Sequence, residues 1–172
     1  MKTIVVRTAV RMTLALMAAA ILAGCGFQLR GSNGQYNMPF KSIYLAFGET
    51  SPLGTELKRN LRAGDSVRIE SDASKAEALF DVLGESRGKA ILSLNSLGRV
   101  REYALSYTLV FRVRDANNKV LLAPTEITLR RNIAFDESQV LAKESEEALL
   151  YRDMQADLVQ QILRRLAAIK PV

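Results

Sequence analysis

The sequence predicts an α+β fold in which two helices pack on one face of a mostly antiparallel, about four-stranded sheet. Residues 103–113 alternate apolar and polar side chains with a period of two, which is typical of a half-buried strand. Residues 51–64 and 150–169 instead repeat apolar side chains about every four residues, which is typical of amphipathic helices. The expected order is therefore a strand, a helix, a run of antiparallel strands and a final helix.

The first 24 residues have the order of an export signal. Lys2, Arg7 and Arg11 precede an apolar run over residues 12–22. A membrane-spanning helix needs about 20 apolar residues. The run is shorter than that, so we favour a cleaved signal peptide, residues 1–24, over a membrane-spanning anchor.

The end of this segment, Leu22-Ala23-Gly24-Cys25, resembles the lipobox of bacterial lipoproteins. The resemblance implies cleavage between Gly24 and Cys25, with a diacylglyceryl group and an N-acyl chain such as palmitate on Cys25. Gly26 stands where lipoproteins retained in the inner membrane typically carry Asp, so it implies the outer membrane, with the lipid-anchored domain on the periplasmic side. Residues 25–39 are rich in Gly, Ser, Asn and Gln, and we interpret them as a flexible tether before one domain, residues 40–172.

Composition argues against an enzyme and against nucleic acid as a partner. Cys25 is the only cysteine and the chain has no histidine, so the commonest catalytic nucleophiles, general bases and transition-metal ligands are missing. The formal charge of +6 includes three basic residues of the signal, and the mature chain carries +3. Export also separates the domain from nucleic acid, and we expect no cofactor besides the lipid on Cys25.

Each expected element of the domain has a local signal. Ser51 and Pro52 begin the first helix, and Gly64 is expected in the left-handed conformation that ends it. Strands are expected at residues 43–47, at 102–114 and around 127–133, with a brief extended piece at 67–69 and a hairpin turn at 115–119. Residues 78–94 form either one long strand bent at Gly84 and Gly88 or two strands in series. The last helix is expected to start at Asp136 or Ser145 and to end at Lys170-Pro171.

Several segments resemble the LptE family of lipopolysaccharide (LPS) assembly lipoproteins. They are Cys25 to Gly31, Arg101 to Tyr107, Val140 to Glu144 and Glu146 to Met154. The resemblance covers essentially the whole mature chain. It implies two helices on a four-stranded sheet, and a protein that plugs the outer-membrane β-barrel LptD, helps it fold and takes part in LPS delivery to the outer leaflet.

LPS carries phosphates and acidic sugars, so a binding site should present Lys or Arg. We selected Arg99 and Arg101, in the turn between two long strands, and Lys143, just before the last helix. A cation beside a helix N-terminus opposes the macrodipole, which suggested a ligand for Lys143. The alternative for all three is a solvated charge on a mobile segment.

Two other functions remained open. A stand-alone carrier of lipids would need an apolar pocket, and a hydrolase would need a pair of catalytic carboxylates. We interpreted Tyr103, Tyr107 and Phe111 as core residues. We interpret the clustered Glu144, Glu146 and Glu147 as favourable charges near a helix start.

Overall fold

The computed structural model describes residues 36–65 and 67–170. The predicted signal peptide, the cleavage position Gly24 and the acylated Cys25 lie outside the described residues, as does most of the predicted tether.

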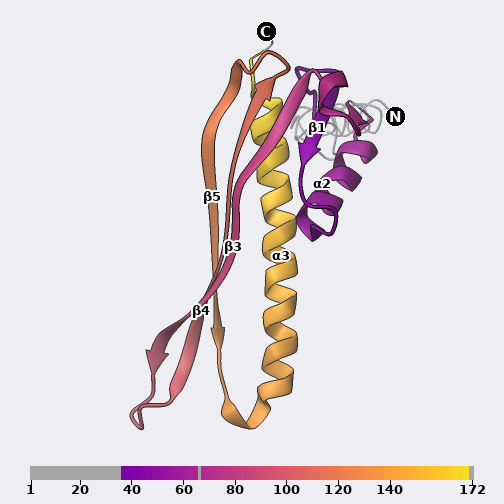
Figure 1. Ribbon diagram of the computed structural model, residues 1–172. Coiled ribbons are helices and arrows are strands. Elements are labelled where there is room, and N and C mark those ends of the chain that lie inside the picture. The colour runs from indigo at the N-terminus through magenta and orange to yellow at the C-terminus, as the bar shows by residue number, and fades with distance from the viewer. Residues whose placement is uncertain (1–35, 66, 171–172) are drawn as a thin grey trace, which may run out of the picture. The chain divides into compact units, whose positions relative to one another are not determined.

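The domain is an α+β arrangement of two helices and one mixed sheet (Figure 1). In chain order the main elements are β1 (Ser42–Ala46), α2 (Pro52–Ala63), β2 (Arg68–Glu70), β3 (Ala78–Leu94), β4 (Val100–Asp115), β5 (Val120–Ala134) and α3 (Val140–Ala167). Short 3₁₀ turns at Ala73–Lys75 and Glu137–Gln139 precede β3 and α3. The sheet order is β2-β1-β3-β4-β5, with β1 parallel to both of its neighbours and the three long strands antiparallel.

The predicted fold class is confirmed, but the predicted number of strands is wrong. The additional strand, β2, pairs with β1 through only three residues. It overlaps the brief extended piece expected at residues 67–69, which is too short to show alternation and was therefore not counted as a strand of the sheet. The bent strand over residues 78–94 is confirmed as one continuous element.

Both helices contribute to one hydrophobic core. Along α2, Leu53, Leu57 and Leu61 are buried at the predicted four-residue spacing. In α3 the buried face includes Met154, Leu158, Ile162 and Leu166, also as predicted. Figure 1 shows α3 running along the three long strands, with α2 beside it. Fully burying each such side chain contributes about 1.5–3 kcal/mol, so helix docking is central to the stability of the domain.

The first helix begins as predicted and ends differently. The Ser51 hydroxyl accepts a hydrogen bond from the Gly54 amide at 3.0 Å, and Pro52 occupies the first turn. Gly64 has φ −78°, so it is not the left-handed residue that we expected. Asp65, the next residue, has φ 47°. Asp tolerates this conformation better than most residues because its short polar side chain can form local hydrogen bonds.

A bulge in β3 decides which side chains face the helices. Val82 pairs with Phe111, and Gly84 pairs with Val110, so Leu83 is the extra residue between them. A one-residue shift moves every following side chain to the opposite face. After the bulge, the odd-numbered residues of β3 therefore share the face of the buried β4 residues, among them Leu105, Tyr107 and Leu109.

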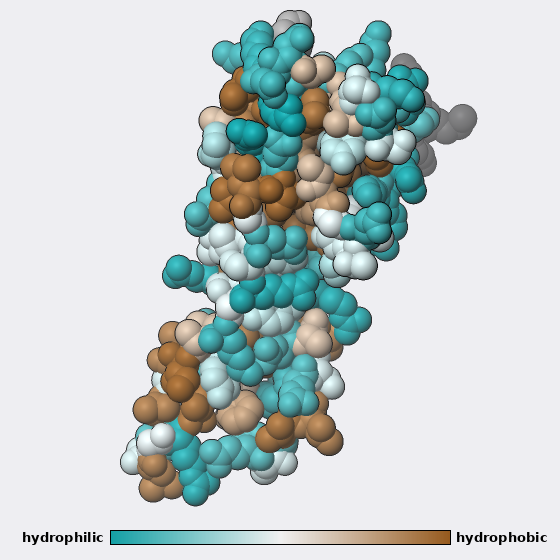
Figure 2. Space-filling model, viewed as in Figure 1, coloured by the Kyte–Doolittle hydropathy of each residue, from teal (hydrophilic) through white to brown (hydrophobic). Residues whose placement is uncertain are grey.

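The hydrophobic core fills only one half of the domain. In α3 no residue before Met154 is buried. Exposed large apolar side chains instead gather at the end of the domain where α3 begins, among them Ile91, Leu92, Leu94, Leu97, Val140 and Leu141. We call this the distal end, residues 91–101 and 135–143, and Figure 2 shows brown surface over it. The opposite, proximal end consists of residues 115–122 and 165–170.

Candidate functional site

The turn between β3 and β4 is held by its own side chains. Gly98 has φ 75°, a conformation that favours glycine. The Asn95 side-chain oxygen accepts hydrogen bonds from the amides of Leu97 at 2.9 Å and Arg99 at 3.0 Å. These bonds fix the backbone from which Arg99 projects.

Arg99 and Arg101 lie together in one cavity of about 260 Å³, whose lining also includes Phe135 and Glu137. The Arg99 guanidinium lies 3.1 Å from the Glu137 carboxylate, and both side chains are more than half exposed. Exposed ion pairs contribute only about 0–1 kcal/mol, so a phosphate can displace the Glu137 carboxylate at small cost. The backbone carbonyl of Arg101 accepts a hydrogen bond from the Phe135 amide at 2.8 Å, which joins the turn to the segment leading into α3.

Lys143 lies within the first turn of α3 and not before the helix as we expected. The helix begins at Val140, between the two predicted starts. Asp136 caps the preceding 3₁₀ turn instead, and the hydrogen bond from the Ser138 amide lowers the pKa of its carboxyl. The Lys143 ammonium lies 2.8 Å from the Glu146 carboxylate, with one fifth of the lysine side chain exposed.

The cavities of the arginines and of Lys143 are neighbours. Lys143 lines a cavity of about 180 Å³ together with Lys89, Tyr103 and Phe135. Phe135 lines both cavities, and its ring packs edge-on against Tyr103 with 5.2 Å between centroids. The structure thus brings all three predicted cations to the distal end, with aromatic side chains between them.

Sequence reasoning missed two further cations on the inner sheet face, Lys89 and Arg87. The Lys89 ammonium donates to the Glu147 carboxylate at 2.6 Å and lies 4.3 Å from the centre of the Tyr103 ring. The hydrogen bond to Glu147 raises the pKa of Lys89. The Arg87 guanidinium lies 4.5 Å from the centre of the Tyr107 ring and 5.4 Å from that of Tyr151.

These groups continue into a polar layer that crosses the domain at the boundary of the core. The Tyr107 hydroxyl donates to Glu85 at 2.6 Å and accepts from Arg87 at 3.3 Å. Arg87 also donates to Gln155 at 3.1 Å, and Gln155 donates to Glu56 of α2 at 2.6 Å. We call Glu56, Glu85, Arg87, Tyr107 and Gln155 the polar belt.

Burial keeps the Tyr107 hydroxyl of the polar belt in its neutral form. Its side chain is fully buried, and burial, together with the bond to Glu85, raises the pKa of its hydroxyl to about 12. The predicted core positions of Tyr107 and Phe111 are confirmed. Tyr103 is only half-buried: it packs against the edge of the core beside the buried Ile133, with the Lys89 ammonium over its ring.

The distal end combines features that suit an anionic amphiphile. Arg99, Arg101 and Lys143, with Lys89 beside them, can donate hydrogen bonds to phosphate, and exposed aliphatic side chains lie at the same end. The two cavities also hold the acids Asp136, Glu137, Glu144 and Glu147, with which these cations share the site. A further cavity of about 600 Å³ beside α3 is lined by three cations, Arg87, Lys89 and Arg152, and by two acids, Glu144 and Glu147.

Residues 36–65 and 67–170 show neither a metal site nor a membrane-spanning helix. These residues contain no cluster of three His, Cys, Asp or Glu side chains able to hold a metal ion. None of the helices described is long and apolar enough to cross a bilayer.

Comparison with known proteins gives a consistent result. A family model described as LptE, lipopolysaccharide-assembly, matches residues 40–166. The LPS-assembly lipoprotein LptE of Pectobacterium atrosepticum is 29% identical over 155 residues, covering 89% of this chain and 82% of that protein. The LPS-assembly lipoprotein LptE of Yersinia enterocolitica is 24% identical over 164 residues. The alignment covers 95% of this chain and 78% of that protein.

Solved structures agree with these relatives. The solution structure of an uncharacterized lipoprotein B from Nitrosomonas europaea shares 40% identity with a TM-score of 0.71, covering 83% of this chain and 91% of that one. The crystal structure of rare lipoprotein B from Shewanella oneidensis is 27% identical in sequence and superposes with a TM-score of 0.65. The match covers 74% of this chain and 95% of that one.

Proposed function

The chain belongs to the LptE family of lipopolysaccharide-assembly proteins, and on that premise we propose that it is an outer-membrane lipoprotein that plugs the LptD barrel and binds LPS through its distal end. Acylated Cys25 anchors it on the periplasmic side. The protein assists barrel folding and takes part in LPS delivery to the outer leaflet. It performs no catalysis.

The observation that carries the LPS proposal is the meeting of cations and exposed apolar side chains at one end of the domain. Arg99 and Lys143 are paired only with carboxylates on exposed residues, Glu137 and Glu146. A phosphate competes for the Arg99 guanidinium more easily than for a buried cation, because its exposed pair with Glu137 contributes little. Exposed Leu97 and Leu141, at 76% and 81%, offer contacts for acyl chains.

The outer sheet face supports contact with a barrel wall. Pairing places Ala90 beside Ala104 and Gly88 beside Ser106 on the face away from the helices. Asn132 lies next to Ala104 on the other side. Small side chains leave this part of the sheet flat, so another sheet can approach it closely.

A stand-alone lipid carrier is less well supported. The space between sheet and helices is filled by the side chains of the core cluster, and the cavities of the described residues lie at its surface. A carrier would need an enclosed apolar pocket for the acyl chains.

LPS binding is tested with a distal double variant, Arg99→Asp with Lys143→Asp. Removing two cations and adding two acids should weaken LPS binding by at least tenfold, measured by titration of the purified lipidated protein. The matched control is Arg62→Asp with Arg130→Asp, which reverses two exposed charges outside the distal end. Equal binding by all three proteins, with unchanged thermal unfolding, would contradict a distal LPS site.

The barrel contact is tested by mild-detergent purification of the tagged protein from outer membranes. We expect a large β-barrel to accompany the wild-type protein and to be lost with Ala104→Arg, which places a long cation on the flat outer face. Ala116→Arg, in the exposed turn between β4 and β5, is the control and should retain the barrel. Absence of any barrel from the wild-type preparation would refute the plug function.

A further inference from the structure

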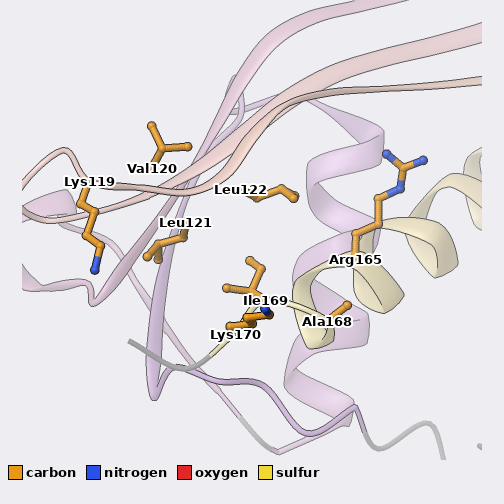
Figure 3. A pocket seen from close by; sticks show the side chains of 8 residues that line it. All are labelled: Lys119, Val120, Leu121, Leu122, Arg165, Ala168, Ile169 and Lys170. Atoms are coloured by element: carbon orange, nitrogen blue, oxygen red, sulfur yellow. The ribbon is translucent and has the colours of Figure 1, made fainter.

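A second cationic and apolar surface lies at the proximal end. A cavity of about 470 Å³ separates the start of β5 from the end of α3. Figure 3 shows Leu121 and Leu122 of β5 near Ile169, with Lys119 and Arg165 on opposite sides of them and Lys170 beside Ile169. We call this cavity the proximal groove.

The groove is lined by three cations and no acid. Among the ion pairs of residues 36–65 and 67–170, none involves Lys119, Arg165 or Lys170. Arg165 donates one long hydrogen bond, 3.4 Å, to the Glu126 carbonyl. The groove cations thus differ from Arg99 and Lys143, whose charges are paired with acids.

Two acids lie near the proximal groove, and both accept hydrogen bonds from backbone amides. Asp115 and Glu77 line an adjoining cavity of about 240 Å³ that shares Lys170 with the groove. Asp115 accepts hydrogen bonds from the Asn117 and Lys119 amides, both at 2.8 Å. Glu77 accepts from the Lys41 amide at 2.7 Å. These carboxylates stabilise a turn and a strand end, and neither forms an ion pair with Lys119 or Lys170.

A structural role explains only part of the arrangement. Arg165 lies in the last turn of α3, where a cation stabilises the helix dipole. Lys119 belongs to the turn between β4 and β5, so the dipole gives it no such role. Its side chain and that of Lys170 are exposed beside half-buried leucines.

The chain enters the domain at this same end. Pro39 and Phe40 line the adjoining cavity together with Ile169 and Lys170. Only ten residues lie between Cys25 and Tyr36, the first described residue. Eleven residue steps span at most about 40 Å. A lipid on Cys25 therefore keeps the proximal groove within one tether length of the membrane surface.

From this geometry we propose that the proximal groove binds an anionic phospholipid of the leaflet that holds the protein's own lipid anchor. Lys119, Arg165 and Lys170 contact the phosphate and headgroup, and Leu121, Leu122 and Ile169 contact the first methylenes of an acyl chain. Positive charge favours this occupant over the tether itself, which carries Arg30 and no acid between Cys25 and Tyr36. Occupation of the groove orients the domain on the membrane, with the distal end pointing away.

The test is to add a short-chain lipid stepwise to the lipidated mature protein in detergent and to monitor the chemical shifts of the backbone amides by NMR. The probe is dihexanoyl-phosphatidylglycerol, which is anionic and remains monomeric at low concentration. We expect saturable shifts at Leu121, Leu122 and Ile169, with at least tenfold weaker binding of dihexanoyl-phosphatidylcholine. Equal binding of the two lipids, equally tight binding of inorganic phosphate alone, or shifts confined to the distal end would overturn the proposal.

Charge variants make the assignment specific. Lys119→Glu with Lys170→Glu should weaken phosphatidylglycerol binding at least tenfold, since each cation at an anionic lipid surface contributes several-fold to affinity. Arg62→Glu with Arg130→Glu, the matched control outside the groove, should change it less than twofold. If the Lys119→Glu, Lys170→Glu variant fails to fold, the neutral variant Lys119→Gln with Lys170→Gln takes its place. It should still weaken phosphatidylglycerol binding several-fold. Unchanged affinity in a folded groove variant would show that the groove is not the site.

Discussion

The proximal and distal halves of the domain share the same three long strands and the same helix, but different forces hold them together. In the proximal half, Phe80 stacks between Phe47 and Phe111 with ring centres 5.5 and 4.7 Å apart. Beyond the polar belt, contacts between helix and sheet include the Lys89–Glu147 pair and the cation–π contact of Lys89 with Tyr103. The proximal half thus supplies most of the stability, and the distal half keeps apolar and charged groups available for partners.

The largest expected effect of a single substitution lies in the proximal core. Phe111→Ala removes a fully buried ring that stacks on Phe80, so the free energy of unfolding should fall by about 3–5 kcal/mol. Urea unfolding followed by circular dichroism measures this. Leu97→Ala is the distal counterpart. With 76% of Leu97 exposed, the change should stay within about 0.5 kcal/mol. If Phe111→Ala and Leu97→Ala lowered the free energy of unfolding by similar amounts, the proximal half would not supply most of the stability.

An intermediate effect is expected at the polar belt, and it depends on pH. Because the pKa of Tyr107 is raised to about 12, the folded protein disfavours its ionisation. This contribution is complete below pH 10, the ordinary tyrosine pKa, and is lost as pH rises through 12. Its size is on the order of 2 kcal/mol.

The Tyr107→Phe variant tests the role of the Tyr107 hydroxyl, because it removes the only group of this side chain that ionises or forms hydrogen bonds. At pH 8 the variant should be less stable by about 1 kcal/mol, because Glu85 and Arg87 lose a hydrogen-bond partner. Between pH 10 and 12 the difference from wild type should shrink or reverse, since the variant has no hydroxyl to ionise. Parallel stability curves for the two proteins across this range would argue against a buried, neutral Tyr107.

The smallest effect is local and concerns the distal contacts. Lys89→Met keeps much of the side-chain volume but removes the ion pair with Glu147 and the cation–π contact with Tyr103. Amides of residues 140–152 should exchange with solvent several-fold faster, since exposed contacts of this kind contribute about 0.5–1 kcal/mol. Residues 154–166 should be unaffected, and acceleration there would mean that the two halves unfold together.

Local patterns in the sequence were sufficient to predict the proximal half. The buried spacing of Leu53, Leu57 and Leu61, and that of Met154, Leu158 and Ile162, was visible because core helices must repeat apolar residues every three to four positions. Strand β4 was equally clear, since its buried residues alternate from Leu105 to Val113.

The polar belt could not be predicted in the same way. The bulge at Leu83 reverses the faces of β3, so a strictly alternating pattern places Arg87 and Lys89 on the wrong side of the sheet. The neighbouring Gly84 suggested a bend but not the direction of the register change. Once the bulge is known, charged residues at 85, 87 and 89 on the inner face indicate where the core must end.

The distal candidates were located by the chemistry of their ligand rather than by pattern. Arg99 and Arg101 are two residues apart, but Lys143 lies 42 residues after Arg101, and only the return of β5 and the start of α3 brings it near them. The start of α3 was uncertain because Gln139 provides no side-chain cap, whereas Asp136 caps a separate 3₁₀ turn. Cys25, the residue on which membrane attachment depends, stays a prediction.

Hydrogen exchange of the lipidated protein, measured with and without LPS, tests the proposed division between halves most directly. Bound LPS should slow exchange over residues 95–101 and 137–150, where the distal cations and exposed leucines lie. Residues 154–166 should keep their exchange rates, since the core that protects them does not contact the ligand. Protection confined to the proximal end, or no protection at all under saturating LPS, would contradict a distal binding surface.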